Sequence, residues 1–412
     1  MVKEKVLFIF TKIYPYGSAE QYIENELKYH LAKFEKVIVI PSEYFGQKLQ
    51  KRIMPDRCEV LDLNAISLRY YVKKDFFLSI SILIFEFFRT RSKLWMLRKI
   101  KRHLGVLNHQ FKCAHVFSEI LQATYAHSHC FFYAYWIHHS SLLLSILNTK
   151  KIISKFICRG HSVDLYEFDW KLVGKVDVVP FYNFIIDQAD RVLPVSLHGY
   201  NYLISRFSGV EDKFEFSRLG VESSGDNQMK DEMTFTLVSC SSINFNKNVE
   251  SIARVFKGLK GRVQWYHFGS GKEAEVNSLR DILMDLPTGH FYELKGNVSN
   301  EEILDFYKNY QVNLFINLSH AEGIPVSMME AISFGIPVLG TRVYGVPEIA
   351  CTETGFCVDL PVNTDKITHT IQEFMSDKQF QLNLRQSAKR YYLANFTAEN
   401  NYNQFIDKFI LN

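Results

Sequence analysis

A strand–helix–strand pattern in the last third of this chain of 412 residues constrains its fold most. The short apolar run Gln311–Asn317 is rich in β-forming residues and predicts a buried strand. A loop at Ser319–Ile324 follows, and Pro325 suits the first position of a helix, where its missing N–H is not needed. Gly335 ends that helix, and Ile336–Leu339 begins the next strand. This order is the unit of a parallel sheet with crossover helices.

Two glutamates give this unit its chemistry. Glu322 lies in the loop at the carboxyl end of the first strand, where open α/β sheets bind ligands, and Glu330 lies beyond the first helical turn. The helix start between them offers free N–H groups and a positive dipole end, which suit a phosphate. A carboxylate beside an anion site is unfavourable unless it binds hydroxyl groups or a positive centre. A sugar and a ribose flanking a pyrophosphate meet that condition.

The run EGIPVSMMEAISFGIPVLGT, which contains both glutamates, resembles the signature of the retaining nucleotide-sugar glycosyltransferases of family 4 (glycosyl transferases group 1), which have the GT-B fold. The resemblance implies that Glu322 faces the donor sugar and that Glu330 binds the ribose hydroxyls. It also implies a donor-binding main chain at Gly323, Ile324, Pro325 and Val326. The alternative is a pair of solvated glutamates on a helix.

At 412 residues the chain is long enough for two domains, and its apolar and charged fractions are ordinary for a globular protein. The formal net charge of +4 is too mild to argue for a nucleic-acid partner, and we expect none. Seven scattered cysteines without a C-x-x-C pair indicate reduced thiols and a cytoplasmic protein. The first apolar run is too short for a signal peptide, and no apolar stretch reaches membrane-spanning length.

The resemblance implies an α/β protein with two Rossmann-like domains that face a central cleft. We expect an acceptor-side domain at residues 1–222 and a nucleotide-sugar-binding domain at 223–395. The polar segment Glu222–Glu232 predicts the boundary between them. Residues 396–412 are expected to form a helix that crosses back to the first domain.

The first turn of the chain follows a strand predicted at Val6–Phe10. Ser18 and Gln21 fit a capping box, which starts a helix with Tyr22 on its buried face. This turn resembles the family's N-terminal loop near the donor phosphates and the acceptor, so Gly17 is a candidate cleft residue. Many members have two glycines where this chain has Gly17 and Ser18, and a turn without ligand contact is the alternative.

Histidines follow two predicted strands of the first half. His138 and His139 come after the strand predicted at Phe131–Ile137. The segment around His161 and Asp164, RGHSVDLY, resembles the family pattern R-x-H-G-x-D-x-Y with serine in place of glycine. A histidine at a strand end can contact sugar hydroxyls or stabilise developing charge, and His161 is the first choice for this role. Asp164 is expected to orient the loop or bind the acceptor; satisfied loop residues are the alternative.

No metal or cofactor is expected. No two potential ligands have a recognised metal-binding spacing, and the family does not require a metal. The nucleotide-sugar is itself the co-substrate.

One of the two cations that the family places beside the donor pyrophosphate is missing from this chain. Lys247 falls where the family places a lysine that neutralises the donor pyrophosphate, whereas the usual arginine five residues earlier is Ser242. Arg342 and Arg218 are candidate replacements. An exposed lysine at a helix start is the alternative for Lys247.

Glycines after a strand predicted at Val263–Phe268 allow two interpretations. Gly269 and Gly271 begin a weak dinucleotide fingerprint, which would suit a dehydrogenase. Family members carry the same G-x-G close to the donor nucleotide, and Gly296 and Val298 match the family's loop against the base.

Residues 76–103 combine an apolar run, Phe76–Phe88, with a basic segment that contains apolar side chains. Such a segment can lie on an anionic membrane surface. The alternative is a buried helix followed by a solvated basic one. Membrane contact would suit a peripheral enzyme at the inner face of the membrane.

The function that we expect is transfer of a sugar from a nucleotide-sugar to a glycan acceptor, lipid-linked and used in surface polysaccharide synthesis. Three alternatives stay open: a non-catalytic nucleotide-sugar-binding scaffold, a sugar-nucleotide epimerase, and the dehydrogenase.

Overall fold

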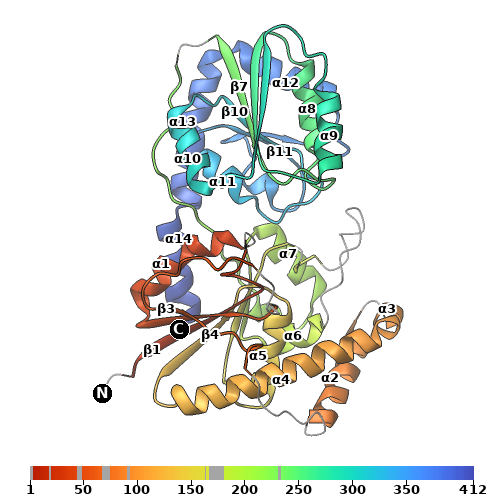
Figure 1. Ribbon diagram of the computed structural model, residues 1–412, viewed down its shortest axis with the longest axis vertical. Helices are drawn as coiled ribbons and strands as arrows, with labels where there is room; N and C mark the ends of the chain where they lie inside the picture. Colours follow the sequence, from red (N-terminus) through yellow and green to blue (C-terminus); the bar gives the residue numbers. More distant parts are fainter. Residues whose placement is uncertain are drawn as a thin grey trace.

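The computed structural model describes residues 3–17, 20–43, 49–66, 75–90, 93–162, 164–166, 181–230 and 233–412. These residues form two α/β domains stacked along the long axis of the molecule (Figure 1). The α/β class predicted from the sequence is confirmed.

The first domain is built on a parallel sheet of six strands in the order β3-β2-β1-β4-β5-β6. Its central strand β1 is almost wholly apolar and buried, as expected for a parallel sheet covered by helices on both faces. The strands are β1 (Lys5–Thr11), β2 (Lys36–Pro41), β3 (Cys58–Val60), β4 (His129–Ala134), β5 (Ile157–Gly160) and β6 (Arg191–Pro194). The helices are η1 (Gln21–Ile23), α1 (Glu24–Lys33), α2 (Phe76–Arg89), α3 (Lys93–Arg98), α4 (Ile100–Thr124), α5 (His139–Thr149), α6 (Tyr182–Gln188), α7 (Leu197–Arg206) and η4 (Glu211–Lys213).

The second domain repeats this architecture with a parallel sheet in the order β12-β11-β10-β7-β8-β9. Its strands are β7 (Thr234–Cys240), β8 (Arg262–Phe268), β9 (His290–Gly296), β10 (Leu314–Asn317), β11 (Val338–Thr341) and β12 (Gly355–Val358). Its helices are α8 (Val249–Gly258), α9 (Glu273–Ile282), α10 (Asn300–Asn309), α11 (Val326–Ser333), η5 (Val346–Glu348), α12 (Thr364–Ser376) and α13 (Lys378–Asn395).

The predicted strand–helix–strand unit is confirmed as β10, α11 and β11, with small shifts at its ends. Pro325 is the N-cap of α11 rather than its first helical residue, and its carbonyl accepts the N–H groups of Met328 and Met329. Gly335 ends the unit's helix with φ of +73°, a left-handed conformation that glycine adopts without strain.

The first helix begins later than its sequence predicts. The capping residue Ser18 lies outside the described residues. Glu20 has φ of +60°, and α1 begins at Glu24 after the short 3-10 helix η1. The left-handed turn at Glu20 interrupts the predicted helix because its carboxylate folds back to the preceding loop.

The C-terminal residues return to the first domain, as predicted. Helix α14 (Ala398–Phe405) and the π-helical turn η6 (Ile406–Ile410) pack beneath α1 and β4 (Figure 1). Phe405 and Ile406 are fully buried there in one apolar cluster with Leu7 and Leu27. The chain therefore crosses between the domains twice.

The two crossings lie side by side. The segments Phe214–Arg218 and Leu219–Val221, which the sequence also predicts as strands, form only isolated bridges. Phe214 pairs with Val192 of the edge strand β6, and Val221 pairs with Thr397 where the chain passes between the domains. At the second bridge the N–H of Val221 donates to Phe396 at 2.9 Å, and the N–H of Ala398 donates to Val221 at 3.0 Å.

Helices α2 and α3 and the adjoining end of α4 project to one side of the first domain (Figure 1). Glu86 on α2 is buried and accepts hydrogen bonds from the side-chain amide of Asn183 at 2.7 Å and the N–H of Phe184 at 3.0 Å, at the start of α6. This contact fixes which face of α2 points outward. In the part of the chain that the structure describes, no helix is long and apolar enough to cross a membrane.

Candidate active site

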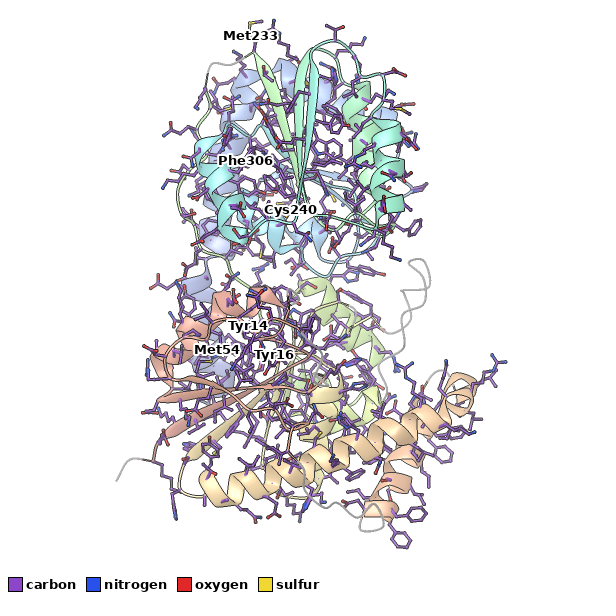
Figure 2. The ribbon with its side chains drawn as sticks, viewed as in Figure 1. Tyr14, Tyr16, Met54, Met233, Cys240 and Phe306 are labelled. Carbon is purple, nitrogen blue, oxygen red and sulfur yellow. The ribbon has the colours of Figure 1, made fainter. Side chains whose placement is uncertain are left out.

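Two neighbouring cavities lie between the domains, and both domains line each of them. Figure 2 shows Tyr14 and Tyr16 of the first domain on the side that faces Cys240 of the second. The larger cavity, of about 560 Å³, is lined by residues that include Tyr22, Asn25, Arg52, Cys240, Asn300 and Glu330. The smaller, of about 260 Å³, is lined by Tyr22, Trp136, His161 and Ser162 from one side and by Lys247, Glu322 and residues 323–327 from the other. The predicted cleft is therefore present.

Glu322 and Lys247 meet in the smaller cavity. Nζ of Lys247 donates to Oε1 of Glu322 at 2.5 Å, and the hydroxyl of Ser319 donates to the same oxygen at 2.8 Å. Lys247 reaches the site from the loop after β7, and Glu322 from the loop after β10. These strands are neighbours in the sheet, so their carboxyl ends bring together two residues that lie far apart in the sequence.

Glu330 lies in the larger cavity, on α11. Its Oε1 accepts a hydrogen bond from the side-chain amide of Asn300 at 2.8 Å. Burial raises the pKa of Glu330 to about 7, although the hydrogen bond from Asn300 opposes this shift. A carboxyl group held this way can accept hydrogen bonds from a ligand's hydroxyl groups.

The loop Gly323–Val326 lies between these two carboxyl groups and touches the other domain. A Cβ added to Gly323 would lie 2.1 Å from the carbonyl oxygen of His161, so only glycine permits this approach. The N–H of Gly345 donates to the carbonyl of Gly323 at 3.0 Å. Ile324, Pro325 and Val326 line the smaller cavity, and their role in donor binding stays a prediction.

A second contact joins the domains at the start of α7. Oε2 of Glu348 accepts from the N–H of Leu197 at 3.0 Å, and Oε1 accepts from the N–H of His198 at 3.0 Å. These N–H groups belong to the first turn of α7 and have no partner within the helix. A carboxylate of the second domain therefore caps a helix of the first.

His161 and Asp164 occupy the loop after β5, as predicted. Nε2 of His161 donates to the carbonyl of Tyr135 at 3.0 Å, which leaves Nδ1 as a hydrogen-bond acceptor. Burial, with the charge of Arg159, lowers the pKa of His161 to about 3, so the ring is neutral at physiological pH. Asp164 accepts three backbone N–H groups, those of Ile137, His161 and Ser162, at 2.9–3.1 Å. It orients this loop and the loop after β4.

Sequence reasoning missed several residues on the first-domain side. Tyr22, expected on a buried helix face, lines both cavities. Its ring and that of Trp136 pack around His161 with centroid distances of 6.1 and 4.6 Å. Glu20 fixes Trp136 by accepting its indole N–H at 2.5 Å, and also accepts the N–H groups of residues 12–14. These contacts join segments 116 residues apart, which no local pattern reveals.

Gly17 has φ of +70°, and its groups are used within the first domain. Its N–H donates to the carbonyl of Gln50 at 2.9 Å, and its carbonyl accepts from Nε of Arg52 at 3.0 Å. Arg52 is the first-domain cation that lines the larger cavity.

The proposed replacements for the missing arginine lie elsewhere. Arg342 pairs with Asp359 at 2.7 Å, and Arg218 donates to Asn395 at 3.2 Å. Neither is among the described residues that line the two cavities. Their assignment as diphosphate ligands stays a prediction.

Gly269 and Gly296, which were predicted to lie near the donor nucleotide, contact each other within the second domain. The N–H of Gly269 donates to the carbonyl of Gly296 at 2.8 Å, and a Cβ on Gly269 would lie 1.9 Å from the carbonyl oxygen of Ser241. Among the described residues that line the cavities, neither glycine nor Val298 is found, whereas Ser299 and Asn300 line the larger one.

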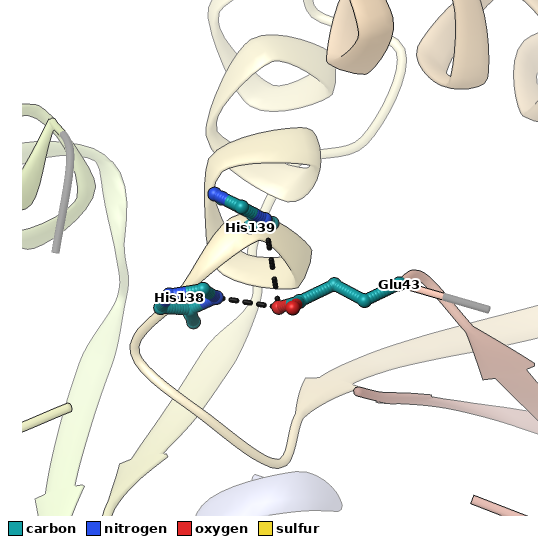
Figure 3. Close-up of side chains that lie close together, drawn as sticks. All are labelled: Glu43, His138 and His139. Carbon is teal, nitrogen blue, oxygen red and sulfur yellow. Dashed lines mark hydrogen bonds and ion pairs between the residues drawn. The ribbon is translucent and has the colours of Figure 1, made fainter. Parts of the chain in front are cut away.

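His138 is the N-cap of α5 and His139 is its first residue, and both contact a third residue, Glu43, which follows β2 (Figure 3). Burial, then the neighbouring His138, lowers the pKa of His139 to about 3. Burial raises the pKa of Glu43, but the hydrogen bond from His138 and nearby charges outweigh it and lower the pKa to about 2. Glu43 was not predicted, because it adjoins the histidines only in space.

Residues 222–391 match the sequence family described as Glycosyl transferases group 1. One relative is the UDP-N-acetylglucosamine–peptide N-acetylglucosaminyltransferase GtfA subunit of Streptococcus parasanguinis. It is 28% identical over 144 residues, which are 34% of this chain and 27% of that protein. The amylovoran biosynthesis glycosyltransferase AmsK of Erwinia amylovora is 26% identical over 179 residues, 41% of this chain and 43% of that protein. The matches thus span less than half of either relative.

The fold resembles that of solved glycosyltransferases. The structure of Anabaena Alr3699/HepE in complex with UDP superposes with a TM-score of 0.65 at 14% identity and covers 98% of both chains. At this identity the likeness concerns the fold, which is the two-domain GT-B arrangement expected from the sequence.

Proposed function

We propose that this chain, whose residues 222–391 belong to the group 1 glycosyltransferases, transfers a sugar from a nucleotide-sugar donor to a glycan acceptor. The observation that carries the proposal is the pairing of Lys247 with Glu322 beside the start of α11, in a cavity that both domains line. A cation, a carboxylate and free helix N–H groups there match a phosphate joined to a sugar.

The donor would extend across both cavities. Glu330 would bind the ribose hydroxyls in the larger cavity, with the diphosphate at the start of α11 and beside Lys247. Glu322 and the main chain of residues 323–326 would bind the sugar in the smaller cavity. The HepE structure in complex with UDP supports this class of donor through the shared fold.

The proposed transfer is retaining. The acceptor hydroxyl attacks the anomeric carbon from the face that the diphosphate leaves, so a new carbon–oxygen bond forms there as the bond to phosphate breaks. The proton of the hydroxyl passes to a leaving phosphate oxygen, and no side chain acts as nucleophile. Lys247 and the helix start stabilise the developing charge electrostatically. Under this proposal the reaction needs no cofactor.

His161 would act as a hydrogen-bond acceptor rather than as a cation. Because Nε2 donates to Tyr135, the neutral ring offers only Nδ1 to a sugar hydroxyl. Asp164 would hold the loop that carries His161. Gly17, His138 and His139 would belong to the acceptor side.

The acceptor that we propose is a lipid-linked glycan at the inner face of a membrane. Helix α2 exposes Phe77, Ile80, Ile84 and Phe88, which are spaced for one helix face; Phe77 is 83% and Phe88 71% exposed. Exposed basic residues follow on the same projection: Arg89, Lys93, Arg98, Lys99, Lys101 and Arg102. Aromatic side chains beside cations suit the headgroup region of an anionic bilayer. The amylovoran name of AmsK supports a role in polysaccharide synthesis, whereas the GtfA name points to a peptide acceptor.

The donor is tested by the melting temperature of the protein with nucleoside diphosphates and nicotinamide dinucleotides, since ligands of the native state raise it. We expect one nucleoside diphosphate to stabilise the wild type and Glu301→Ala, but not Glu330→Ala. Glu301 is an exposed carboxylate that lines the same cavity and serves as the control. No response to any nucleotide would favour a scaffold without donor binding, and a response to a dinucleotide alone would favour the dehydrogenase.

Turnover tests the chemistry. With the donor that this screen identifies, we expect Lys247→Ala to lower turnover by about 100-fold or more, the usual loss when one charge-stabilising group is removed. An anomeric configuration retained in the product supports the retaining mechanism, and an inverted one refutes it. Conversion of donor to a new sugar-nucleotide without acceptor would identify an epimerase.

Vesicle sedimentation tests the membrane surface. We expect wild type to bind vesicles that contain anionic phosphatidylglycerol and to be released by salt. Replacing Phe77 and Phe88 with serine should abolish binding without changing nucleotide stabilisation, because α2 lies outside the cavities. Equal binding by this variant would refute the assignment of the surface to α2.

A further inference from the structure

We propose that Glu43, His138 and His139 form a binding site for one divalent transition-metal ion of the zinc class. Oε1 of Glu43 lies 2.5 Å from Nδ1 of His138 and 3.5 Å from Nδ1 of His139 (Figure 3). One ligand atom from each residue lies within 4.8 Å of the other two. Two ligands of a tetrahedral zinc ion lie about 3.3–3.6 Å apart, since each bond is about 2.0–2.2 Å. The ion would therefore replace the hydrogen bond between Glu43 and His138, and side-chain movements of about 1 Å would bring the three ligand atoms to these distances.

The donor set selects the class of ion. Two imidazole nitrogens and one carboxylate oxygen suit zinc and its neighbours in the transition series, whereas magnesium and calcium prefer oxygen ligands. Three protein ligands also leave at least one coordination position open, as in catalytic zinc sites. Use of that position by an acceptor oxygen rests on the proposed function; binding of the ion does not.

The fold holds the three side chains together. Strands β2 and β4 flank β1 on its two sides, so residues after their carboxyl ends meet across the end of β1. The side chains of Glu43, His138 and His139 are only 14%, 24% and 18% exposed, so packing restricts them. The nearby cation is Lys12, whose Nζ lies 3.9 Å from Oε2 of Glu43, and whose side chain is 52% exposed and can turn to solvent.

The site is separate from the donor cavities, because none of its three residues is among the described residues that line them. The expectation of no metal rested on spacing along the chain and on the family resemblance. Glu43 lies 95 residues before His138, so the third ligand becomes visible only in the folded protein.

The test is a calorimetric titration of chelator-treated protein with zinc chloride, without donor or acceptor. We expect one ion per chain, with affinity lowered at least about tenfold in Glu43→Gln, His138→Ala and His139→Ala. His369→Ala is the matched control, because His369 is an exposed histidine that lies 3.4 Å from a carboxylate, that of Glu373. Circular dichroism and unfolding midpoints show that each variant is folded, and Glu43→Gln keeps an oxygen that can accept from His138.

Cobalt substitution gives an independent readout. We expect the visible spectrum of the cobalt-loaded protein to show nitrogen and oxygen ligands and no thiolate charge-transfer band, although the chain has seven cysteines. Failure of wild type to bind zinc stoichiometrically would overturn the proposal. Unchanged affinity in all three folded variants, or a thiolate band, would do the same. None of these outcomes depends on glycosyl transfer, so the proposed function is judged separately.

Discussion

Replacement of Glu330 by glutamine is expected to stabilise the unliganded protein at pH 8 while it removes donor binding. Burial raises the pKa of Glu330 to about 7, from 4.5 in a solvated chain. The folded state therefore holds the proton more tightly than the unfolded state, and the wild type loses stability as the pH rises between these two values. Glutamine remains neutral and can still accept from Asn300, so the variant avoids this loss.

The magnitude follows from the shift. A difference of about 2.5 units, at 1.36 kcal/mol each, gives about 3 kcal/mol at pH 8 and close to nothing at pH 4. For a domain of 150–250 residues this corresponds to a rise in melting temperature of about 6–12 °C. The assay is thermal unfolding of wild type and Glu330→Gln from pH 4 to 8, followed by circular dichroism.

The control for this series is Glu301→Gln, which removes an exposed carboxylate from the same cavity. Its melting temperature should follow that of wild type at every pH. Either of two results would refute the argument that the buried carboxylate is held at an energetic cost. One is a melting-temperature difference between Glu330→Gln and wild type that does not grow with pH. The other is a Glu330→Gln variant less stable than wild type at pH 8. Such a cost is expected where a carboxylate is retained for binding rather than for stability.

Three further variants test the contacts around the cleft. Gly323→Ala should separate the domains, because its Cβ would meet His161 at 2.1 Å; turnover should fall, and small-angle scattering should report a larger radius of gyration. Glu348→Ala removes the second-domain carboxylate that helps to cap α7 and should destabilise the protein by about 0.5–2 kcal/mol in chemical denaturation. Asp164→Ala leaves three backbone N–H groups without their acceptor and should cost about 3 kcal/mol or more by the same measurement. Unfolding midpoints equal to that of wild type would contradict the last two assignments.

The sequence predicted most of the fold because the signals were local. Apolar runs such as Val6–Phe10 and Val263–Phe268 are strands within one or two residues of their predicted ends. Predictions failed where a distant contact decided the local structure. Helix α1 starts late because the carboxylate of Glu20 turns back to the preceding loop, and Leu219–Val221 bridges to Thr397 rather than joining a sheet.

The candidate site was predicted unevenly for the same reason. Glu322, Lys247, Glu330 and His161 line the cavities, because each follows a strand or occupies a helix that the pattern located. Arg52 had no such signal, because it reaches its cavity from a segment after β2 without a recognisable motif.

The paired crossings at Val221 and Ala398 limit how the two domains can move. Two connections far apart would prevent the domains from rotating relative to each other, and a single connection would allow them to rotate independently. Here both strands of the connection are hydrogen-bonded to each other, and Gly220 packs so closely on Ala398 that an added Cβ would lie 2.5 Å from its Cα. We expect these two paired segments to act as one hinge that permits opening about a narrow set of axes. A donor that enters when the hinge opens would meet the same opposing loops each time it shuts.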